Sequence, residues 1–178
     1  MKTYIALLRG INVSGQKKVP MAELRELLSK AGLASVKTYI QSGNVIFQSS
    51  EKHIQSLEFK IHNAIKKHFG FEVPVIIKTP NELQKIFDSC PFSEEKKQKS
   101  YFMMLFAVPE ETSVEEVIKI SYPNEVFQIT DDYVYFSCSA GYGSAKMNNN
   151  FFERKLKVTA SARNYRTMLK LLSLSTDN

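Results

Sequence analysis

The first 79 residues alternate between strand-like and helix-like hydrophobic patterns in an order that few folds accept. Tyr4–Leu8 is apolar on both faces, which predicts a central strand, and Pro20 opens a helix with one apolar stripe. Ser42-Gly43 joins two stretches of period-two alternation, which predicts a hairpin. The expected strands are 4–8, 36–41, 44–48 and 73–78, and the expected helices are 20–32 and 51–68. The order strand, helix, strand, strand, helix, strand is that of a ferredoxin-like, or split βαβ, unit.

The last of these strands contains Pro74. Proline cannot donate a hydrogen bond to a neighbouring strand, so it belongs at the edge of a sheet. The split βαβ unit places its fourth strand at an edge, and the residue pattern therefore agrees with the topology.

The second half repeats the order but ends differently. Its expected strands are 101–108, 126–129 and 133–137, and its expected helices are 81–89, one from Ser113, 144–157 and 162–172. A helix thus replaces the final strand. The sequence predicts an α+β fold of two fused ferredoxin-like units with mainly antiparallel sheets, residues 1–79 and an incomplete unit at 80–178 packed closely on the first. Without a fourth strand, the strand at 101–108 would be an exposed apolar edge, so we expect the other half or the last helix to cover it.

Charge is distributed unevenly along the chain. The net charge is +6, yet residues 80–139 contain 11 acidic and 5 basic residues between two basic ends. This pattern favours either solvated helix faces or a basic surface for an anionic partner. No apolar run approaches the ~20 residues that span a bilayer, and no leader pattern is present, so we expect no membrane association. Cys90 and Cys138 lack metal or redox spacing, which is typical of reduced cysteines in a cytoplasmic protein.

A first candidate site follows from the topology of the first half. The end of the first strand and the tip of the hairpin lie at the same end of the sheet. Five polar side chains should therefore be neighbours: Arg9, Asn12, Gln41, Ser42 and Asn44. An arginine fork and amide groups suit a phosphate or carboxylate, which predicts a small anionic ligand. The alternative is a polar network that only ties the two loops together.

A second candidate site lies near the carboxyl terminus. Arg163, Asn164 and Thr167 belong to the expected last helix, and Arg163 lies in its first turn, where an arginine is tolerated best if an anion offsets the helix dipole. The alternative is an ordinary solvated helix face. The segment 141–146, with glycines at 141 and 143 and a lysine at 146, is a further possible anion loop.

The sequence gives less support to nucleotide hydrolysis, metal binding and catalysis. The loop from Gly10 to Lys17 departs from the phosphate-binding loop because its lysine is one place late and Lys18 stands where a Ser or Thr is needed. The three histidines lie on one expected helix, where His53 and His62 face opposite sides, so no metal site is predicted. No catalytic residue and no cofactor motif is identified. An enzyme acting on a small phosphorylated or nucleotide-like substrate remains an alternative, as does nucleic-acid binding through a basic surface.

Several motifs together resemble the bacterial domain-of-unknown-function 1697 family. They are Leu7–Val13, Pro20–Leu24, Thr38–Phe47 and Arg163–Thr167. The resemblance covers nearly the whole chain and implies two fused α+β units without an assigned activity. The family's closing motif usually has two threonines before the arginine and a tryptophan after the asparagine, whereas this chain has Ser161-Ala162 and Tyr165. This departure leaves any role of the preceding hydroxyls without support. The resemblance supplies no catalytic residues, because the family is credited with none.

Overall fold

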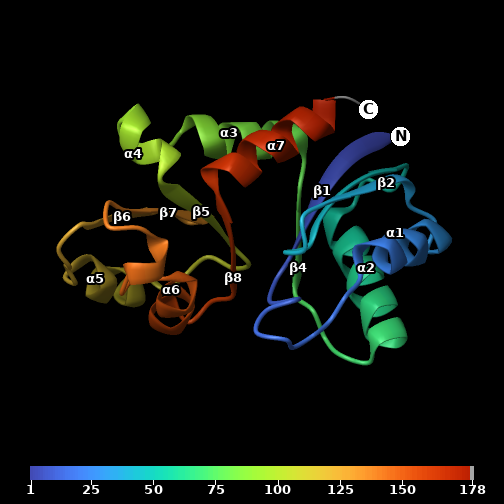
Figure 1. Cartoon of the computed structure of the whole chain (residues 1–178), viewed down its shortest axis with the longest axis horizontal. Helices are drawn as coiled ribbons and strands as arrows, with labels where there is room; N and C mark the ends of the chain where they lie inside the picture. The colour runs from blue at the N-terminus through green and yellow to red at the C-terminus, as the bar shows by residue number, and fades with distance from the viewer. Residues whose placement is uncertain (177–178) are drawn as a thin grey trace. The chain divides into compact units, whose positions relative to one another are not determined.

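The computed structural model describes residues 1–176 of the 178-residue chain. Its elements group into two compact units (Figure 1). Unit 1 comprises residues 1–84 together with the carboxyl-terminal residues from 170, and unit 2 comprises residues 85–169. The division falls inside helices α3 (Pro80–Asp88) and α7 (Tyr165–Thr176). Each unit contains a four-stranded antiparallel sheet with helices, so the predicted α+β class is confirmed, while the expected domains 1–79 and 80–178 stay a prediction.

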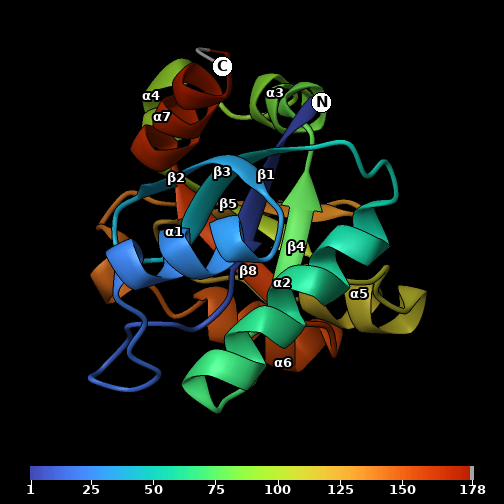
Figure 2. The ribbon, with the colours of Figure 1, turned by 90° about the vertical axis from the view of Figure 1, so that its right-hand side faces the viewer.

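Unit 1 has the predicted split βαβ order. Its strands are β1 (Lys2–Leu8), β2 (Ala34–Tyr39), β3 (Asn44–Ser49) and β4 (Val75–Lys78), and their order in the sheet is β2-β3-β1-β4. Its helices α1 (Met21–Lys30) and α2 (Ile54–Phe69) cover one face of this sheet (Figure 2). As Pro74 indicated, β4 is an edge strand.

The core of unit 1 is built from side chains that alternate between the two faces of its strands. Tyr4, Ala6 and Leu8 alternate along β1 and pack with Phe47 of β3, whose ring stacks on Tyr4 at 5.7 Å between centroids. Ile5, Leu7 and Ile46 point to the other face and are also fully buried, as expected for central strands. The aromatic side chains of β1 and β3 therefore lie inside the protein and do not form an exposed stacking surface.

The free edge of β4 is blocked by a partly buried carboxylate. Glu58 of α2 accepts a hydrogen bond from the N–H of Ile77, with 2.9 Å between N and Oε1. Burial raises the pKa of Glu58, although this hydrogen bond and the charge of Lys78 act in the opposite direction.

We expect Glu58→Gln to raise the thermal stability at neutral pH. A carboxyl group whose folded pKa is raised is least favourable in its charged form, so its contribution to stability is lost as pH rises above the ordinary value of 4.5. Glutamine keeps an acceptor for Ile77 without the charge, so the gain in melting temperature should vanish as pH falls toward that value. Glu72→Gln is the matched control with the opposite sign, because Lys66 lowers the pKa of Glu72 through a hydrogen bond of 2.7 Å. Thermal melts between acidic and neutral pH test both variants, and a lower melting temperature of Glu58→Gln at neutral pH would contradict the assignment.

In unit 2, four strands and two helices follow the order seen in unit 1, with a short helix and one 3-10 turn added. Its strands are β5 (Ser100–Leu105), β6 (Glu125–Ile129), β7 (Tyr133–Cys138) and β8 (Ala160–Asn164), in the order β6-β7-β5-β8. Helices α5 (Glu111–Ile118) and α6 (Asn149–Leu156) pack on one face, where residues of both join the hydrophobic core (Figure 1). The short helix α4 (Glu94–Gln98) is fastened to the other face, because the hydroxyls of Ser100 and Ser137 both donate to the carbonyl oxygen of Lys96. A single 3-10 turn, η1 (Tyr142–Ser144), follows β7.

The expectation that unit 2 lacks its last strand is wrong. Ala160–Asn164 forms β8, which pairs antiparallel with β5 over its whole length. The apolar edge of β5 is therefore covered by a strand of its own unit, not by the other half or the last helix. The sequence Ala-Ser-Ala-Arg-Asn has neither β-branched nor aromatic residues, so its own propensity does not indicate a strand, and pairing with a buried neighbour decides its conformation. The last helix consequently begins at Tyr165, later than expected.

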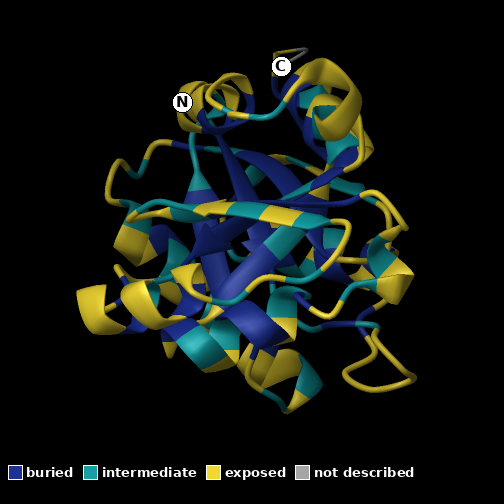
Figure 3. Cartoon of the chain, turned by 90° about the vertical axis from the view of Figure 1, so that its left-hand side faces the viewer, coloured by how far each residue is buried: buried dark blue, intermediate teal, exposed yellow. Residues whose placement is uncertain are grey.

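Most buried residues lie in the strands and on the helix faces that pack against them, whereas the loops and the outer faces of the helices are exposed (Figure 3). None of the helices in residues 1–176 combines the length and apolarity needed to cross a membrane.

Candidate functional site

The structure brings the first strand's exit and the hairpin tip together. The N–H of Leu8 donates to the carbonyl oxygen of Gly43 at 2.8 Å. Asn12 lies at the centre of this junction: its Nδ2 donates to the carbonyl oxygens of Val19 (3.0 Å) and Gln41 (2.8 Å), and its Oδ1 accepts from the N–H of Val19 (2.8 Å). Both amide hydrogens and the amide oxygen of Asn12 are thus used within the protein.

The side-chain amide of Asn44 also forms its hydrogen bonds within the hairpin. It is fully buried, and its Nδ2 donates to the carbonyl oxygen of Tyr39 (2.9 Å) and to the hydroxyl of Ser42 (3.0 Å). Arg9 follows β1 and is half-buried, and its backbone N–H donates to the carbonyl oxygen of Pro74 at 3.0 Å. The arrangement of Asn12 and Asn44 matches a polar network that ties the loop to the hairpin.

The second predicted cluster is divided between a strand and a helix. Arg163 lies on β8, not in the first turn of a helix, because the strand continues to Asn164. Its side chain is buried, and Nη1 donates to the Ser161 hydroxyl (3.0 Å) and the Ala162 carbonyl oxygen (2.7 Å). Asn164 caps α7 by accepting from the N–H of Thr167 at 2.9 Å, and Thr167 is itself buried. Of these three predicted residues, Asn164 is the exposed one.

Asn164 lines a hollow at one end of the unit 2 sheet, which we call the strand-end hollow. Because β5 runs antiparallel to β7 and β8, its beginning meets the ends of both neighbours. The hollow has a volume of about 550 Å³. It is lined by residues 98–101, 138–142 and 164–166.

The charge of the strand-end hollow has one sign. Lys99 and Arg166 line it and are exposed, whereas no Asp or Glu does so within the described part of the chain. The nearest partner of Lys99 is Glu95, at 3.6 Å between Nζ and Oε1, and both side chains are largely exposed, so water screens this pair. The amino-terminal turn of α7 begins at the same place, and its aligned N–H groups add partial positive charge.

Tyrosine side chains form the apolar part of the walls. The rings of Tyr101 and Tyr142 stack at 3.8 Å between centroids. Tyr165 packs against Phe87 at 5.3 Å, and its hydroxyl donates to Glu94 at 3.2 Å. Desolvation and this contact with the Glu94 carboxylate raise the pKa of Tyr165, so its hydroxyl stays neutral.

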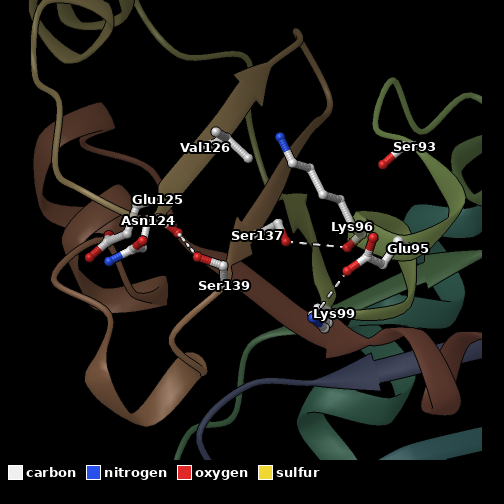
Figure 4. A pocket seen from close by; sticks show the side chains of 9 residues that line it. All are labelled: Ser93, Glu95, Lys96, Lys99, Asn124, Glu125, Val126, Ser137 and Ser139. Atoms are coloured by element: carbon white, nitrogen blue, oxygen red, sulfur yellow. Dashed lines mark hydrogen bonds and ion pairs between the residues drawn. The ribbon is translucent and has the colours of Figure 1, made fainter.

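A second, smaller hollow of about 240 Å³ adjoins the first, since both are lined by Lys99 and Ser139 (Figure 4). Side chains of α4 stand on one side of it, and Val126 and Ser137 of the sheet stand on the other. Its lining contains two lysines and two glutamates, of which Glu125 accepts from the backbone N–H groups of residues 146 and 147. The opposite charges in this hollow give it little preference for anions over cations.

Histidines and cysteines do not cluster. His62 contacts the carbonyl oxygen of Val73 at 2.9 Å, and His68 contacts the Glu23 carboxylate at 2.6 Å. Within residues 1–176, no three His, Cys, Asp or Glu side chains gather closely enough to hold a metal ion. Cys90 and Cys138 are both free thiols, and burial raises the pKa of Cys90.

The prediction from sequence missed Lys99, Tyr101 and Arg166 as members of a site. Each lies at the end of a different element or just beyond it, and only the pairing of β8 with β5 brings those ends together. Two signals were available: the glycine-containing segment at 141–146, whose first residues line the hollow, and the cluster at 163–167, which contains Arg166 and whose predicted member Asn164 lines the hollow.

Comparisons with known proteins agree with this architecture. The model of a family described as "Protein of unknown function (DUF1697)" matches residues 1–135. A solved structure of a conserved bacterial protein from Streptococcus pneumoniae is similar with a TM-score of 0.74 and 24% sequence identity, over 97% of this chain and 98% of that one. At this identity the likeness shows the fold alone. No curated protein matches the sequence significantly.

Proposed function

This chain belongs to the DUF1697 family of proteins of unknown function, and because membership brings no activity with it, we propose a function from the side chains of unit 2. The protein binds a small phosphorylated or otherwise anionic ligand in the strand-end hollow. The observation that carries the proposal is that two cationic side chains, Lys99 and Arg166, line this hollow without a carboxylate among the described lining residues.

Different side chains around the hollow would recognise different parts of the ligand. Arg166 offers a planar fork of donors that fits two oxygens of a phosphate or carboxylate, and Lys99 adds a mobile point charge. Asn164 is exposed, lines the hollow and uses its Oδ1 to cap α7, so its amide nitrogen is the group that would donate to the ligand. The stacked rings of Tyr101 and Tyr142 supply a flat apolar wall for a ring of the ligand.

A binding role fits the hollow better than the alternatives. Glu58, a carboxylate with a raised pKa of the kind that enzymes use, lies in unit 1 and is bonded to the edge of β4. The aromatic pair Tyr4 and Phe47, which an RNA-binding sheet would need on its surface, is buried in the core. The proposal includes a cytoplasmic location, which the two free cysteines support.

Adenosine monophosphate is a suitable probe, because it combines a phosphate with a flat ring. We expect Lys99→Ala with Arg166→Ala to weaken its binding by at least about 100-fold, since each charge-assisted hydrogen bond contributes about 1.5–3 kcal/mol and every 1.4 kcal/mol is tenfold in affinity. Isothermal titration calorimetry measures the affinity. Adenosine and inorganic phosphate, titrated separately, show which half of the probe carries the interaction.

The matched control is Lys119→Ala with Arg154→Ala, which removes the same charge from exposed positions of unit 2 outside the hollow. This control should bind like the parent protein. If both double variants lose affinity equally, general charge and not the strand-end hollow is responsible, and if adenosine monophosphate and phosphate fail to bind at millimolar concentration, the proposal is wrong.

A further inference from the structure

The free edge of β6 differs from the other sheet edges. Two hydrogen bonds fix which of its backbone groups face β7: Thr130 N to Tyr133 O, and Ser139 N to Asn124 O, both at 2.9 Å. In an antiparallel pair such bonds recur at every second residue, so Val126 and Gln128 bond to β7. The N–H and C=O groups of Phe127 and Ile129 therefore point away from the sheet.

The corresponding groups on β8 are occupied by side chains. The N–H of Ala160 donates to Glu153 Oε1 at 2.9 Å, and its carbonyl oxygen accepts from Asn149 Nδ2 at 3.0 Å. The carbonyl oxygen of Ala162 accepts from Arg163 Nη1 at 2.7 Å. These side chains prevent another strand from pairing with β8.

The two edges of the unit 1 sheet are also guarded. Glu58 accepts the outward N–H of Ile77 on β4. On β2 the register shifts between Ala34 and Lys37, and such a bulge disrupts the regular edge. In contrast, β6 keeps its register from Glu125 to Ile129, and among the described residues no side chain caps the N–H of Phe127 or Ile129.

A groove runs along this open edge. The end of α5 and the segment after it line a hollow of about 420 Å³ together with β6. Ile118 is 64% exposed there, and the half-buried side chains of Phe127 and Ile129 also line the groove, so it offers apolar surface beside outward-facing backbone groups. This combination suits an added strand, whose main chain gives affinity and whose alternate side chains enter the groove.

The acidic side chains near the groove indicate which kind of strand could bind there. Four acidic side chains are exposed on α5 and in the turn after β6 (Glu115, Glu116, Asp131 and Asp132), against one exposed lysine at the end of α5, Lys119. A second copy of this chain would bring the same acidic side chains against each other. We propose that the edge of β6 binds an extended basic peptide as a fifth strand of the unit 2 sheet.

The test uses a fluorescein-labelled peptide of alternating lysine and valine, about eight residues long, and a counterpart with glutamate in place of lysine. Fluorescence anisotropy should show binding of the basic peptide and at least about tenfold weaker binding of the acidic one. Val126→Lys should weaken binding of the basic peptide about tenfold, because it places a cation on the edge. Val108→Lys is the matched control at a position that is 62% exposed and outside the groove, and it should bind like the parent protein.

Amide hydrogen exchange of the full chain locates the contact directly. The amides of Phe127 and Ile129 should exchange quickly in the free protein and slow about tenfold or more with the basic peptide, whereas Val126 and Gln128 are protected throughout. Binding without protection at Phe127 and Ile129, or equal binding of both peptides, would overturn the proposal. Protection that rises with protein concentration alone would overturn it in favour of pairing between two copies.

Discussion

Gly43→Ala is expected to destabilise the protein by about 3 kcal/mol, which lowers the melting temperature of a chain of this size by roughly 6–12 °C. Gly43 has a φ of +83°, where an alanine costs ~1 kcal/mol or more. A Cβ atom built there would lie 2.6 Å from the Cβ of Leu8 and 2.9 Å from the Cδ1 of Ile11. Leu8 belongs to β1, so the overlap is with backbone-bound atoms of the central strand and cannot be relieved by turning a flexible side chain.

Gly70→Ala separates the two causes. Gly70 has a nearly equal φ of +81°, but a Cβ atom there would meet nothing within 4 Å. This control should therefore show only the backbone cost, about 1 kcal/mol. Urea unfolding of both variants measures the difference, and equal losses for Gly43→Ala and Gly70→Ala would show that the hairpin tip does not pack on β1 as described.

Asn12→Ala should have the second largest effect, a loss of about 3 kcal/mol. It removes three hydrogen bonds, each with a net contribution of about 1 kcal/mol, and leaves the buried backbone N–H of Val19 without its acceptor. The φ of Asn12 is +53°, a region that asparagine tolerates better than alanine does.

The matched variant is Asn12→Gly, which loses the same side chain but not the tolerance for positive φ. It should be more stable than Asn12→Ala by about 1 kcal/mol and still well below the parent protein. Asn63→Ala, at an exposed position on α2, should change stability by less than about 0.5 kcal/mol. An unfolding free energy of Asn12→Ala within that same margin of the parent would contradict the network.

The sequence predicted unit 1 better than unit 2, for a physical reason. Tyr4–Leu8 is apolar throughout because the strand is buried on both faces. The helices of unit 1 have clear apolar stripes, so in this unit the hydrophobic pattern of each segment indicates its secondary structure. Ala160–Asn164 carries small and polar residues, and its conformation is decided by pairing with β5, a contact more than fifty residues away in the chain. Such a strand cannot be recognised from local propensity.

The candidate site shows the same limit. The meeting of Leu8 with Gly43 followed from topology alone, because both belong to elements that the sequence predicted correctly. The strand-end hollow exists only because β8 pairs with β5, and the sequence did not predict β8. Asn164 was therefore proposed as part of a helix, and Arg166 was not included in the predicted site. The amides that looked available in the sequence, Asn12 and Asn44, use their donors within the hairpin junction, which residue type cannot reveal.

The central claim is that an anion binds at the end of the unit 2 sheet. Its most direct measurement is the titration of isotopically labelled parent protein with adenosine monophosphate, followed by amide chemical shifts. Shifts concentrated at Lys99, at 139–141 and at Asn164–Arg166 are the predicted result. Shifts confined to the segments 9–17 and 41–44, or none at millimolar probe, would contradict it.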